Sequence, residues 1–322
     1  MTAAHPPLRD AATTAPQAAP RLAVMLAGVV FPTPVLAAPG TLGFGREVRG
    51  TVDLRAFGGF ITKSLTAEPR GGHARPQIVE VAGGWLNAVG LANPGLTAFL
   101  TRDLPYLRTL SIPIVVSLAG ASVEEFRLMA QVLDEEDGIA AIEVNVSCPN
   151  VAEGMLFGTD PALTAELVRA LRGATGRPLF VKLTPNVTSI AAIARAAVDA
   201  GADALCCINT LAGLAIDPES WRPRLGGGMG GLSGPAIRPV AVRMVWEVAR
   251  AVPVPVIGAG GVGNAADALE FFLAGARAVA VASAVISDPA AAERITEGLS
   301  AYLSAHGIAD INDIVGKVEG LD

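Results

Sequence analysis

Residues 179–209, LFVKLTPNVTSIAAIARAAVDAGADALCCIN, contain two short apolar segments on either side of an amphipathic one. Leu179–Thr184 and Ala204–Asn209 are apolar along most of their length, which is typical of strands that are buried on both faces. Between them, Ile190–Ala200 places its apolar residues at helical spacing. A buried strand, a helix and a second buried strand in this order predict two parallel strands joined by a helical crossover.

The same alternation runs through most of the chain. Further strands are predicted at Val35–Pro39, Gly59–Ser64, Ile112–Leu118, Ala141–Val146, Val254–Ala259 and Ala278–Ser283. Further helices are predicted at Val123–Glu136, Pro161–Ala174, Ala236–Ala251 and Ala265–Ala274. Eight such units favour the α/β class and a single (β/α)8 TIM barrel with inserted active-site loops. The alternative, a doubly wound open sheet, needs nucleotide-binding glycines after its first strand, whereas the glycines here are spread along the chain.

The N-terminal region divides into two parts. Residues 1–19 are rich in Ala, Pro and Thr, which predicts a disordered tail, and residues 20–322 are predicted to form one domain. The apolar segment 21–40 resembles a signal peptide, but Pro32 and Pro34 interrupt it. We therefore favour a hairpin that leads into the first barrel strand. We expect no membrane span elsewhere, because no other apolar segment is long enough.

Composition excludes several classes of partner. The formal net charge of −6, the pI of about 5.2 and the absence of a Lys/Arg cluster argue against nucleic-acid binding. His5, His73 and His306 are scattered, so no metal site is predicted. Three cysteines, two of them adjacent in the apolar pair Cys206 and Cys207, do not make a disulfide framework and fit a cytoplasmic protein.

Polar residues collect where predicted strands end, which is where barrels carry their active sites. In Ile142–Asn150 an apolar strand pattern leads into Asn145, Ser147, Cys148 and Asn150. A cysteine among groups that donate and accept hydrogen bonds can act as a nucleophile or as a proton-transfer base. Cys206 and Cys207 lie between Leu205 and Ile208, so core packing explains them better.

Two lysines and two glycine-rich segments extend this pattern. Lys63 and Lys182 lie near the ends of buried strands, where desolvation is costly, and are predicted to face an anionic or electron-rich ligand. Gly258–Gly263 precedes a helix that begins near Asn264, and glycines there allow close approach to a phosphate or simply a tight turn. Gly226–Pro235 is predicted to be a mobile or phosphate-binding loop.

Taken together, these motifs resemble those of the class 1 dihydroorotate dehydrogenases, most closely class 1B. The resemblance extends from about residue 21 to residue 316 and is carried by Gly40–Arg46, Lys63 and Ser64, Glu68–Arg70, Asn87–Leu91, Asn145–Asn150, Lys182–Pro185, Asn209 and Thr210, Gly231–Pro235, and Gly260 and Gly261. It implies an FMN-dependent oxidation of dihydroorotate to orotate in the biosynthesis of pyrimidines and UMP. Cys148 would remove the proton from C5 of the substrate while hydride leaves C6 for N5 of the flavin.

The resemblance also implies the binding residues. Substrate contacts would come from Lys63, Asn87, Ala88, Val89, Gly90, Leu91, Asn145, Asn150, Asn209 and Thr210. FMN contacts would come from Pro39, Lys63, Ser64, Ser117, Asn145, Lys182, Ile208, Gly234, Gly260, Gly261, Ala282 and Ser283. Lys182 would lie near the N1–C2=O edge of the flavin, where negative charge develops on reduction.

Three positions depart from the family pattern. Pro39 replaces a common serine, Ser117 a common asparagine, and Ala282 with Ser283 a common Gly-Thr pair. Each change removes or shortens a polar contact to the flavin, yet the proposed base, the substrate asparagines and Lys182 are present, so we expect flavin to bind.

The resemblance further implies a homodimer that forms a heterotetramer with an electron-transfer subunit. That partner would carry FAD and a 2Fe–2S cluster and pass electrons to NAD, because this chain has no cysteine spacing for a cluster.

Other functions compete with this one. A related flavin barrel that acts on another dihydropyrimidine would not need a carboxylate pocket, and a class 1A enzyme would use fumarate. Class 2 enzymes, which bind membranes and use serine as base, do not fit Cys148. A barrel that reduces uridine in RNA would need a basic face, and a scaffold without flavin is the non-catalytic alternative.

Overall fold

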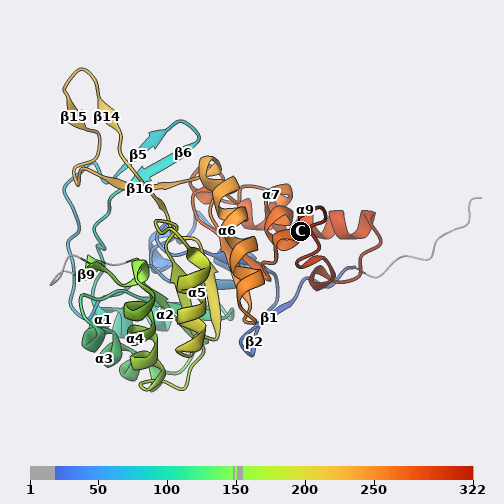
Figure 1. The fold of residues 1–322 in the computed structure, drawn as a ribbon, viewed down its shortest axis with the longest axis horizontal. Helices are drawn as coiled ribbons and strands as arrows, with labels where there is room; N and C mark the ends of the chain where they lie inside the picture. Colours follow the sequence, from blue (N-terminus) through green and yellow to red (C-terminus); the bar gives the residue numbers. More distant parts are fainter. Residues whose placement is uncertain (1–18, 148, 151–154, 322) are drawn as a thin grey trace, which may run out of the picture.

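The fold is a closed barrel of eight parallel strands (Figure 1). The computed structural model describes residues 19–147, 149–150 and 155–321, with side chains at 19–147 and 157–321. In chain order the barrel strands are β3 (Val35–Ala37), β4 (Gly59–Ile61), β7 (Ile114–Leu118), β8 (Ala141–Asn145), β11 (Leu179–Leu183), β12 (Ala204–Cys207), β17 (Val256–Ala259) and β18 (Ala278–Val281). Each strand pairs with the next, and β18 pairs with β3 to close the barrel. The predicted TIM barrel and its eight strands are confirmed.

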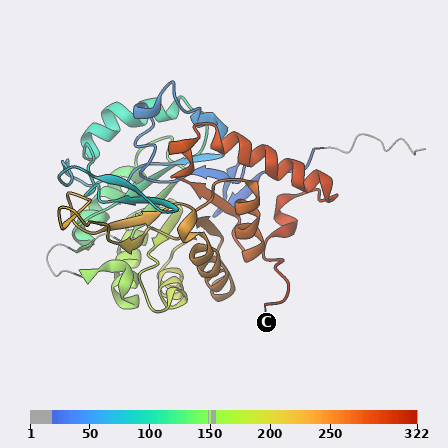
Figure 2. The ribbon, with the colours of Figure 1, turned by 90° about the horizontal axis from the view of Figure 1, so that it is seen from above.

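Helices form a ring around these strands (Figure 2). The predicted helices are confirmed as α3 (Val123–Asp134), α4 (Pro161–Arg172), α5 (Ile190–Asp199), α6 (Arg238–Ala251) and α7 (Ala265–Ala274). In α5, the side chains of Ile190, Ile193, Ala194 and Ala197 are buried, which is the spacing of one helical face. Ser189 caps this helix by accepting a hydrogen bond from the Ala192 N–H.

The remaining elements lie at the chain ends and in the connections. They are α1 (Leu96–Ala98), α2 (Leu104–Arg108), α8 (Ala284–Ser287), α9 (Ala291–Ala305), β9 (Pro149–Asn150), β10 (Met155–Leu156), η1 (Arg46–Val48), η2 (Leu54–Ala56), η3 (Phe99–Asp103), η4 (Phe157–Thr159), η5 (Pro235–Ile237) and η6 (Ile311–Ile314). The sequence reasoning did not identify α9, which packs against α7. Within the described ranges, no helix is both long and apolar enough to cross a membrane.

The predicted N-terminal hairpin is present as β1 (Val24–Leu26) and β2 (Val29–Phe31). Its two turn residues, Ala27 and Gly28, both have positive φ, the geometry that matches the twist of two-residue hairpins. Phe31 is fully buried, and a Cβ added at Gly59 would lie 2.6 Å from its ring. The glycine at the start of β4 thus lets the hairpin pack against the barrel.

A four-stranded antiparallel sheet is inserted outside the barrel. It has the order β13 (Leu211–Gly213), β16 (Gly230–Ser233), β6 (Gly84–Asn87) and β5 (Ile78–Val81). A hairpin of β14 (Ile216–Asp217) and β15 (Arg222–Pro223) projects from the molecule at the upper left of Figure 1.

The glycine-rich segment that was predicted to be a loop therefore contains a strand, β16, which is paired on both sides. Its glycines allow close packing, because a Cβ at Gly231 would lie 2.0 Å from Oγ1 of Thr210.

Candidate functional site

The predicted site residues meet at the carboxyl ends of the barrel strands. Asn145 is the last residue of β8, Lys182 lies in β11, and Ser117 lies in β7. The others follow directly after strands: Pro39 after β3, Lys63 and Ser64 after β4, Ile208 to Thr210 after β12, Gly260 and Gly261 after β17, and Ala282 and Ser283 after β18. This is the end at which TIM barrels carry their active sites.

Side-chain amides connect three of these strand ends. The Asn209 Nδ2 group donates to Oδ1 of Asn145 at 3.2 Å and to Oγ of Ser147 at 2.9 Å. The Asn145 Nδ2 group in turn donates to Oγ of Ser64 at 3.2 Å. The structure thus brings together Asn145, Asn209 and Ser147, the residue before Cys148. Cys148 itself lies outside the described residues, and Asn150 is described by its backbone in β9.

A cavity opens beside this amide network. Its lining includes Pro39, Lys182, Ile208, Asn209, Thr210, Ser233, Gly234, Ile237, Gly260, Gly261, Ala282 and Ser283. Gly260 and Gly261 have φ values of +124° and +86°, and Cβ atoms there would lie 2.9 Å from Ala241 Cβ and 2.8 Å from Arg238 Cβ. Because glycine alone fits this backbone without strain, main-chain atoms form that wall of the cavity. Ser233 and Ile237 were not identified from the sequence.

Lys182 lies on the cavity wall, although it is only 6% exposed. Its Nζ donates to Sγ of Cys206 at 3.2 Å. Burial opposes the charge on Lys182, but Cys206 and Glu143 outweigh that effect and raise its pKa. Cys206 and Cys207 are fully buried, as predicted, yet Cys206 also belongs to the site. The sequence did not single out Glu143, and it assigned Cys206 to core packing alone, yet both residues interact with Lys182.

Lys63 is half-buried at the end of β4. Burial lowers the pKa of its ammonium, and the nearby Glu47 carboxylate partly offsets this effect. The segment Gly40–Arg46 folds over this lysine, since the Lys63 N–H donates to the Gly43 carbonyl at 2.9 Å. Lys63 thus combines a fixed backbone with a side chain that gives up its proton more readily than an ordinary lysine.

Asn87 and the residues that follow it are held by the inserted sheet. The Asn87 Nδ2 group donates to the Gly231 carbonyl at 3.0 Å, and Gly231 packs against Thr210. Further along, the Val89 and Leu91 carbonyls accept hydrogen bonds from the His73 N–H and the Asn93 side chain. The contact of Ala88, Val89, Gly90 and Leu91 with substrate stays a prediction.

Ser117 and Ser64 are buried and are not among the residues that line the cavity. Ser117 is fully buried, its hydroxyl donates to Oε1 of Glu143 at 2.9 Å, and its oxygen lies 3.0 Å from Oγ of Ser64. The Ser117 hydroxyl is therefore engaged inside the barrel. Flavin contacts of Ser64, Ser117, Lys63 and Asn145 also stay predictions.

The N-terminus of α7 differs from the expectation. Asn264 accepts a hydrogen bond from the Asp267 N–H at 3.0 Å, and the Asp267 carboxylate accepts one from the Gly263 N–H at 2.9 Å. Arg238 also forms an ion pair with Asp267. The helix thus supplies its own cap and its own negative charge, and the N–H groups of Gly263 and Asp267 are already engaged. Phosphate binding by the other backbone groups of this segment stays a prediction.

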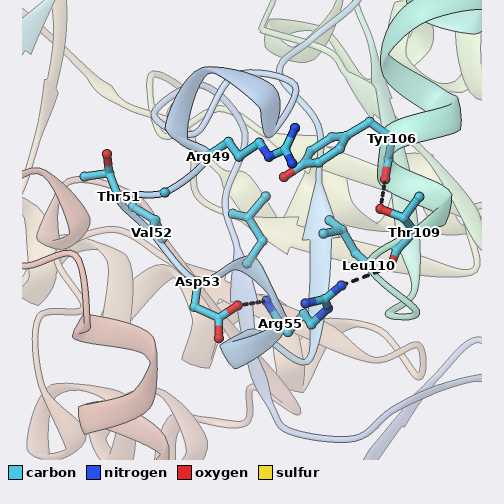
Figure 3. Close-up of a pocket in the computed structure, with 10 residues that line it drawn as sticks. Arg49, Thr51, Val52, Asp53, Arg55, Tyr106, Thr109 and Leu110 are labelled. Carbon is cyan, nitrogen blue, oxygen red and sulfur yellow. Dashed lines mark hydrogen bonds between the residues drawn. The ribbon is translucent and has the colours of Figure 1, made fainter.

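A second concave region, shown in Figure 3, belongs to the segments that lead into β4 and β7. It is lined by Arg49, Gly50, Thr51, Val52, Asp53, Leu54, Arg55, Tyr106, Thr109 and Leu110. Hydrogen bonds from the Arg55 N–H to Asp53 and from Thr109 Oγ1 to the Tyr106 carbonyl hold its walls. None of the predicted site residues lies in it. No group of three potential metal ligands occurs in the part of the chain that the structure describes.

Comparisons with known proteins agree with this geometry. The family model for dihydroorotate dehydrogenase matches residues 21–303. The chain is 52% identical to the "Dihydroorotate dehydrogenase B (NAD(+)), catalytic subunit" of Geotalea uraniireducens over 300 residues, 93% of this chain and 98% of that one. It is also 52% identical to the protein of the same name from Desulforudis audaxviator, over 92% of this chain and 97% of the relative.

A solved structure shares the fold at lower sequence identity. It is a dihydroorotate dehydrogenase of Eimeria tenella in complex with ferulenol, with a TM-score of 0.75, 23% identity, and coverage of 92% of this chain and 88% of that one. The family model spans most of the sequence, and the curated relatives match it nearly end to end. The chain therefore belongs to the dihydroorotate dehydrogenase family.

Proposed function

We propose that this chain oxidises dihydroorotate to orotate in pyrimidine biosynthesis, as a catalytic subunit whose electrons pass on to NAD. The observation that carries the proposal is the set of hydrogen bonds joining Asn209, Asn145 and Ser147 at the cavity, one residue before Cys148. Asparagine amides both donate and accept, which suits the carboxylate and imide edges of orotate. The names of the relatives favour NAD over fumarate as the final acceptor.

The family implies a flavin, and the residues that line the cavity are of the kinds that would hold one. Gly260 and Gly261 line the wall with main-chain groups, and Lys182 offers a cation there. We propose that the flavin is FMN and that Pro39, Lys182, Ile208, Gly234, Ala282 and Ser283 contact it. A bound flavin supplies the hydride acceptor. Pro39 and Ala282 have no side-chain hydroxyl, and Ser283 is smaller than the common threonine. The backbone and Lys182 would therefore provide most of the polar contacts.

The residues of this chain would remove the proton, orient the substrate and bind its carboxylate. Cys148 would take the C5 proton as a thiolate, since a neutral thiol holds its own proton too tightly. Asn145, Asn209 and Thr210 would orient the substrate ring, with Asn150 and the Asn87–Leu91 segment completing the enclosure. Lys63, half-buried and cationic, would pair with the substrate carboxylate.

Further parts of the proposal concern partners. We infer a homodimer and a heterotetramer with an electron-transfer subunit that carries FAD and a 2Fe–2S cluster, in the cytoplasm. The relatives are named catalytic subunits, which supports a second subunit. Cys206 and Cys207 are buried inside the barrel wall, where they are not placed to ligate an exposed cluster.

An anaerobic visible spectrum tests the proposal. Dihydroorotate should bleach the flavin band of the purified chain, dihydrouracil, which lacks the carboxylate, should not, and Cys148→Ser should slow the bleaching strongly at neutral pH. Cys207→Ala is the matched control, because it removes a buried thiol outside the cavity lining. Bleaching by dihydrouracil alone would point to another dihydropyrimidine, and a purified chain that contains no flavin would contradict the proposal.

A further inference from the structure

Four polar side chains lie in the barrel interior below the cavity. Ser117, Glu143, Lys182 and Cys206 come from the successive strands β7, β8, β11 and β12. Three of them are fully buried, and Lys182 is 6% exposed. Interiors of such barrels are packed mainly with branched apolar side chains, and a buried charge without a partner is costly. A lysine and a glutamate in this place therefore need an explanation.

The contacts among these residues place a thiol between the two charged groups. The Lys182 ammonium donates to the Cys206 sulfur at 3.2 Å, and the Cys206 thiol and the Glu143 carboxyl group are close enough to interact electrostatically. The Oε1 atom of Glu143 accepts from Ser117 at 2.9 Å, while Oε2 finds no hydrogen-bond partner among the described residues. Because β8 and β12 are separated by β11, Glu143 and Cys206 can meet only inside the barrel.

This arrangement assigns a charge to each group. Burial raises the pKa of Cys206 to about 11, so the group is a neutral thiol near pH 7, and its sulfur can accept from Lys182. Burial also raises the pKa of Glu143, and the Lys182 ammonium opposes that shift. One cation and one carboxylate in the same interior compensate each other, whereas either alone would be an uncompensated buried charge.

We propose that Glu143 and Cys206 are positioning residues for Lys182: the carboxylate keeps this lysine charged inside the barrel, and the thiol sulfur holds its ammonium at the cavity. The inference rests on the proposed flavin site, toward which Lys182 is directed. Through Lys182, the two residues set how strongly the protein favours the reduced flavin, because a nearby cation stabilises the added negative charge.

The test is the midpoint potential of the bound flavin, measured by spectroelectrochemistry on the full-length holoprotein between about pH 6 and about pH 9. In Glu143→Gln, Lys182 should lose its proton at a lower pH than in the wild type. Below that pH the potential should exceed the wild-type value, because a negative charge is gone. Above that pH it should fall under the wild-type value, because the cation is gone. A pH dependence parallel to that of the wild type would overturn the role of Glu143.

Variants of Cys206 test the role of the thiol independently of Glu143, and they remain informative if Glu143→Gln does not fold. In Cys206→Ala, Lys182 loses its sulfur partner and can turn to the free Oε2 of Glu143, away from the cavity, so the potential should fall at every pH. Cys206→Ser restores a donor and acceptor and should bring the potential back toward the wild type. A Cys206→Ala potential equal to that of the wild type would overturn the role of the thiol. Absence of flavin in the wild-type chain would instead mark the failure of the proposed function.

Discussion

The Asn209 side chain donates a hydrogen bond to Oδ1 of Asn145 at 3.2 Å, across the strand β11 that separates their own strands. The same amide also holds the hydroxyl of Ser147 at 2.9 Å. Two asparagines from separate parts of the chain are thereby fixed against each other before any substrate arrives, and pre-organisation of this kind lowers the cost of ordering a reactive complex.

Removing this amide should impair catalysis more than stability. Asn209→Ala removes the donor to Ser147 Oγ and leaves Asn145 Oδ1 with the Ser147 N–H alone. A lost partner of this kind costs about 1–3 kcal/mol, so kcat/KM for dihydroorotate should fall roughly tenfold to a hundredfold. Steady-state kinetics on the wild type and the variant would measure the change. The control is Asn186→Ala, which removes an exposed asparagine bonded to Thr184 and to the Thr210 carbonyl. Equal losses in both variants would show that the Asn209 contact has no special role.

Gly261 should be needed for flavin retention. Its φ of +86° and the 2.8 Å approach of an added Cβ to Arg238 make Gly261→Ala strained by about 1–3 kcal/mol. The flavin-to-protein ratio after gel filtration should therefore drop. Gly263→Ala is the matched control, since its added Cβ would lie 3.3 Å from the Asp267 carboxylate and its φ is not in the left-handed region. Full flavin content in Gly261→Ala would contradict the assignment of this wall.

Orotate binding should weaken as the pH rises from about 7 to about 10. Burial lowers the pKa of Lys63, so its positive charge is lost at a lower pH than that of an ordinary lysine, and the attraction for the ligand carboxylate is lost with it. Binding can be followed through the change that orotate causes in the visible spectrum of the oxidised protein. In Lys63→Gln, binding should be weak, and its decrease over the same range should be smaller than in the wild type. A wild-type affinity that stays constant with pH would rule out this lysine as the carboxylate partner.

Asp310 should stabilise the link between the N-terminal segment and η6. Burial opposes its ionisation, but hydrogen bonds from the Asn312 N–H and the Arg21 side chain outweigh that effect and lower its pKa. The contribution of Asp310 to the free energy of unfolding is therefore complete above the ordinary carboxyl pKa of about 3.9. It is lost as the pH falls through the lowered pKa of the folded state.

Asp310→Ala should lower the free energy of unfolding by about 1 kcal/mol near neutral pH, because a cap is lost and the paired Arg21 is 70% exposed. Urea unfolding measured near neutral pH and in acid gives the comparison, and the difference from the wild type should vanish in acid. Asp313→Ala, at an exposed position of the same short helix, should change little. A difference that persists in acid would mean that packing is responsible instead of charge.

The barrel could be predicted because each unit carries its own local signal. Strands such as Leu179–Leu183 are buried on both faces and read as continuous apolar segments, and the helices between them show one buried face. The inserted sheet carries no such signal. Its strand β16 is half glycine and is held by partners that are distant in sequence. The local sequence of this segment therefore predicts a loop.

The site was predictable at the strand ends and less so inside the barrel. Lys182 is recognisable because a charge in an apolar strand is costly, and the same argument applies to Glu143 in Ala141–Asn145. Cys206 could not be recognised, because a cysteine between apolar neighbours looks the same whether or not it touches a lysine. The capping of α7 by Asp267 depends on a carboxylate turning back to Gly263, which spacing alone does not specify.

The inserted sheet has a consequence for the order in which the molecule is assembled. Its central pair joins β6 to β16, and the Asn87 side chain reaches Gly231, which is 144 residues away in the chain. Closing so long a loop is entropically costly until the barrel has brought the two segments near each other. We therefore expect this sheet to form late in folding, so that a newly made chain completes its barrel before the segment carrying Asn87 is in place.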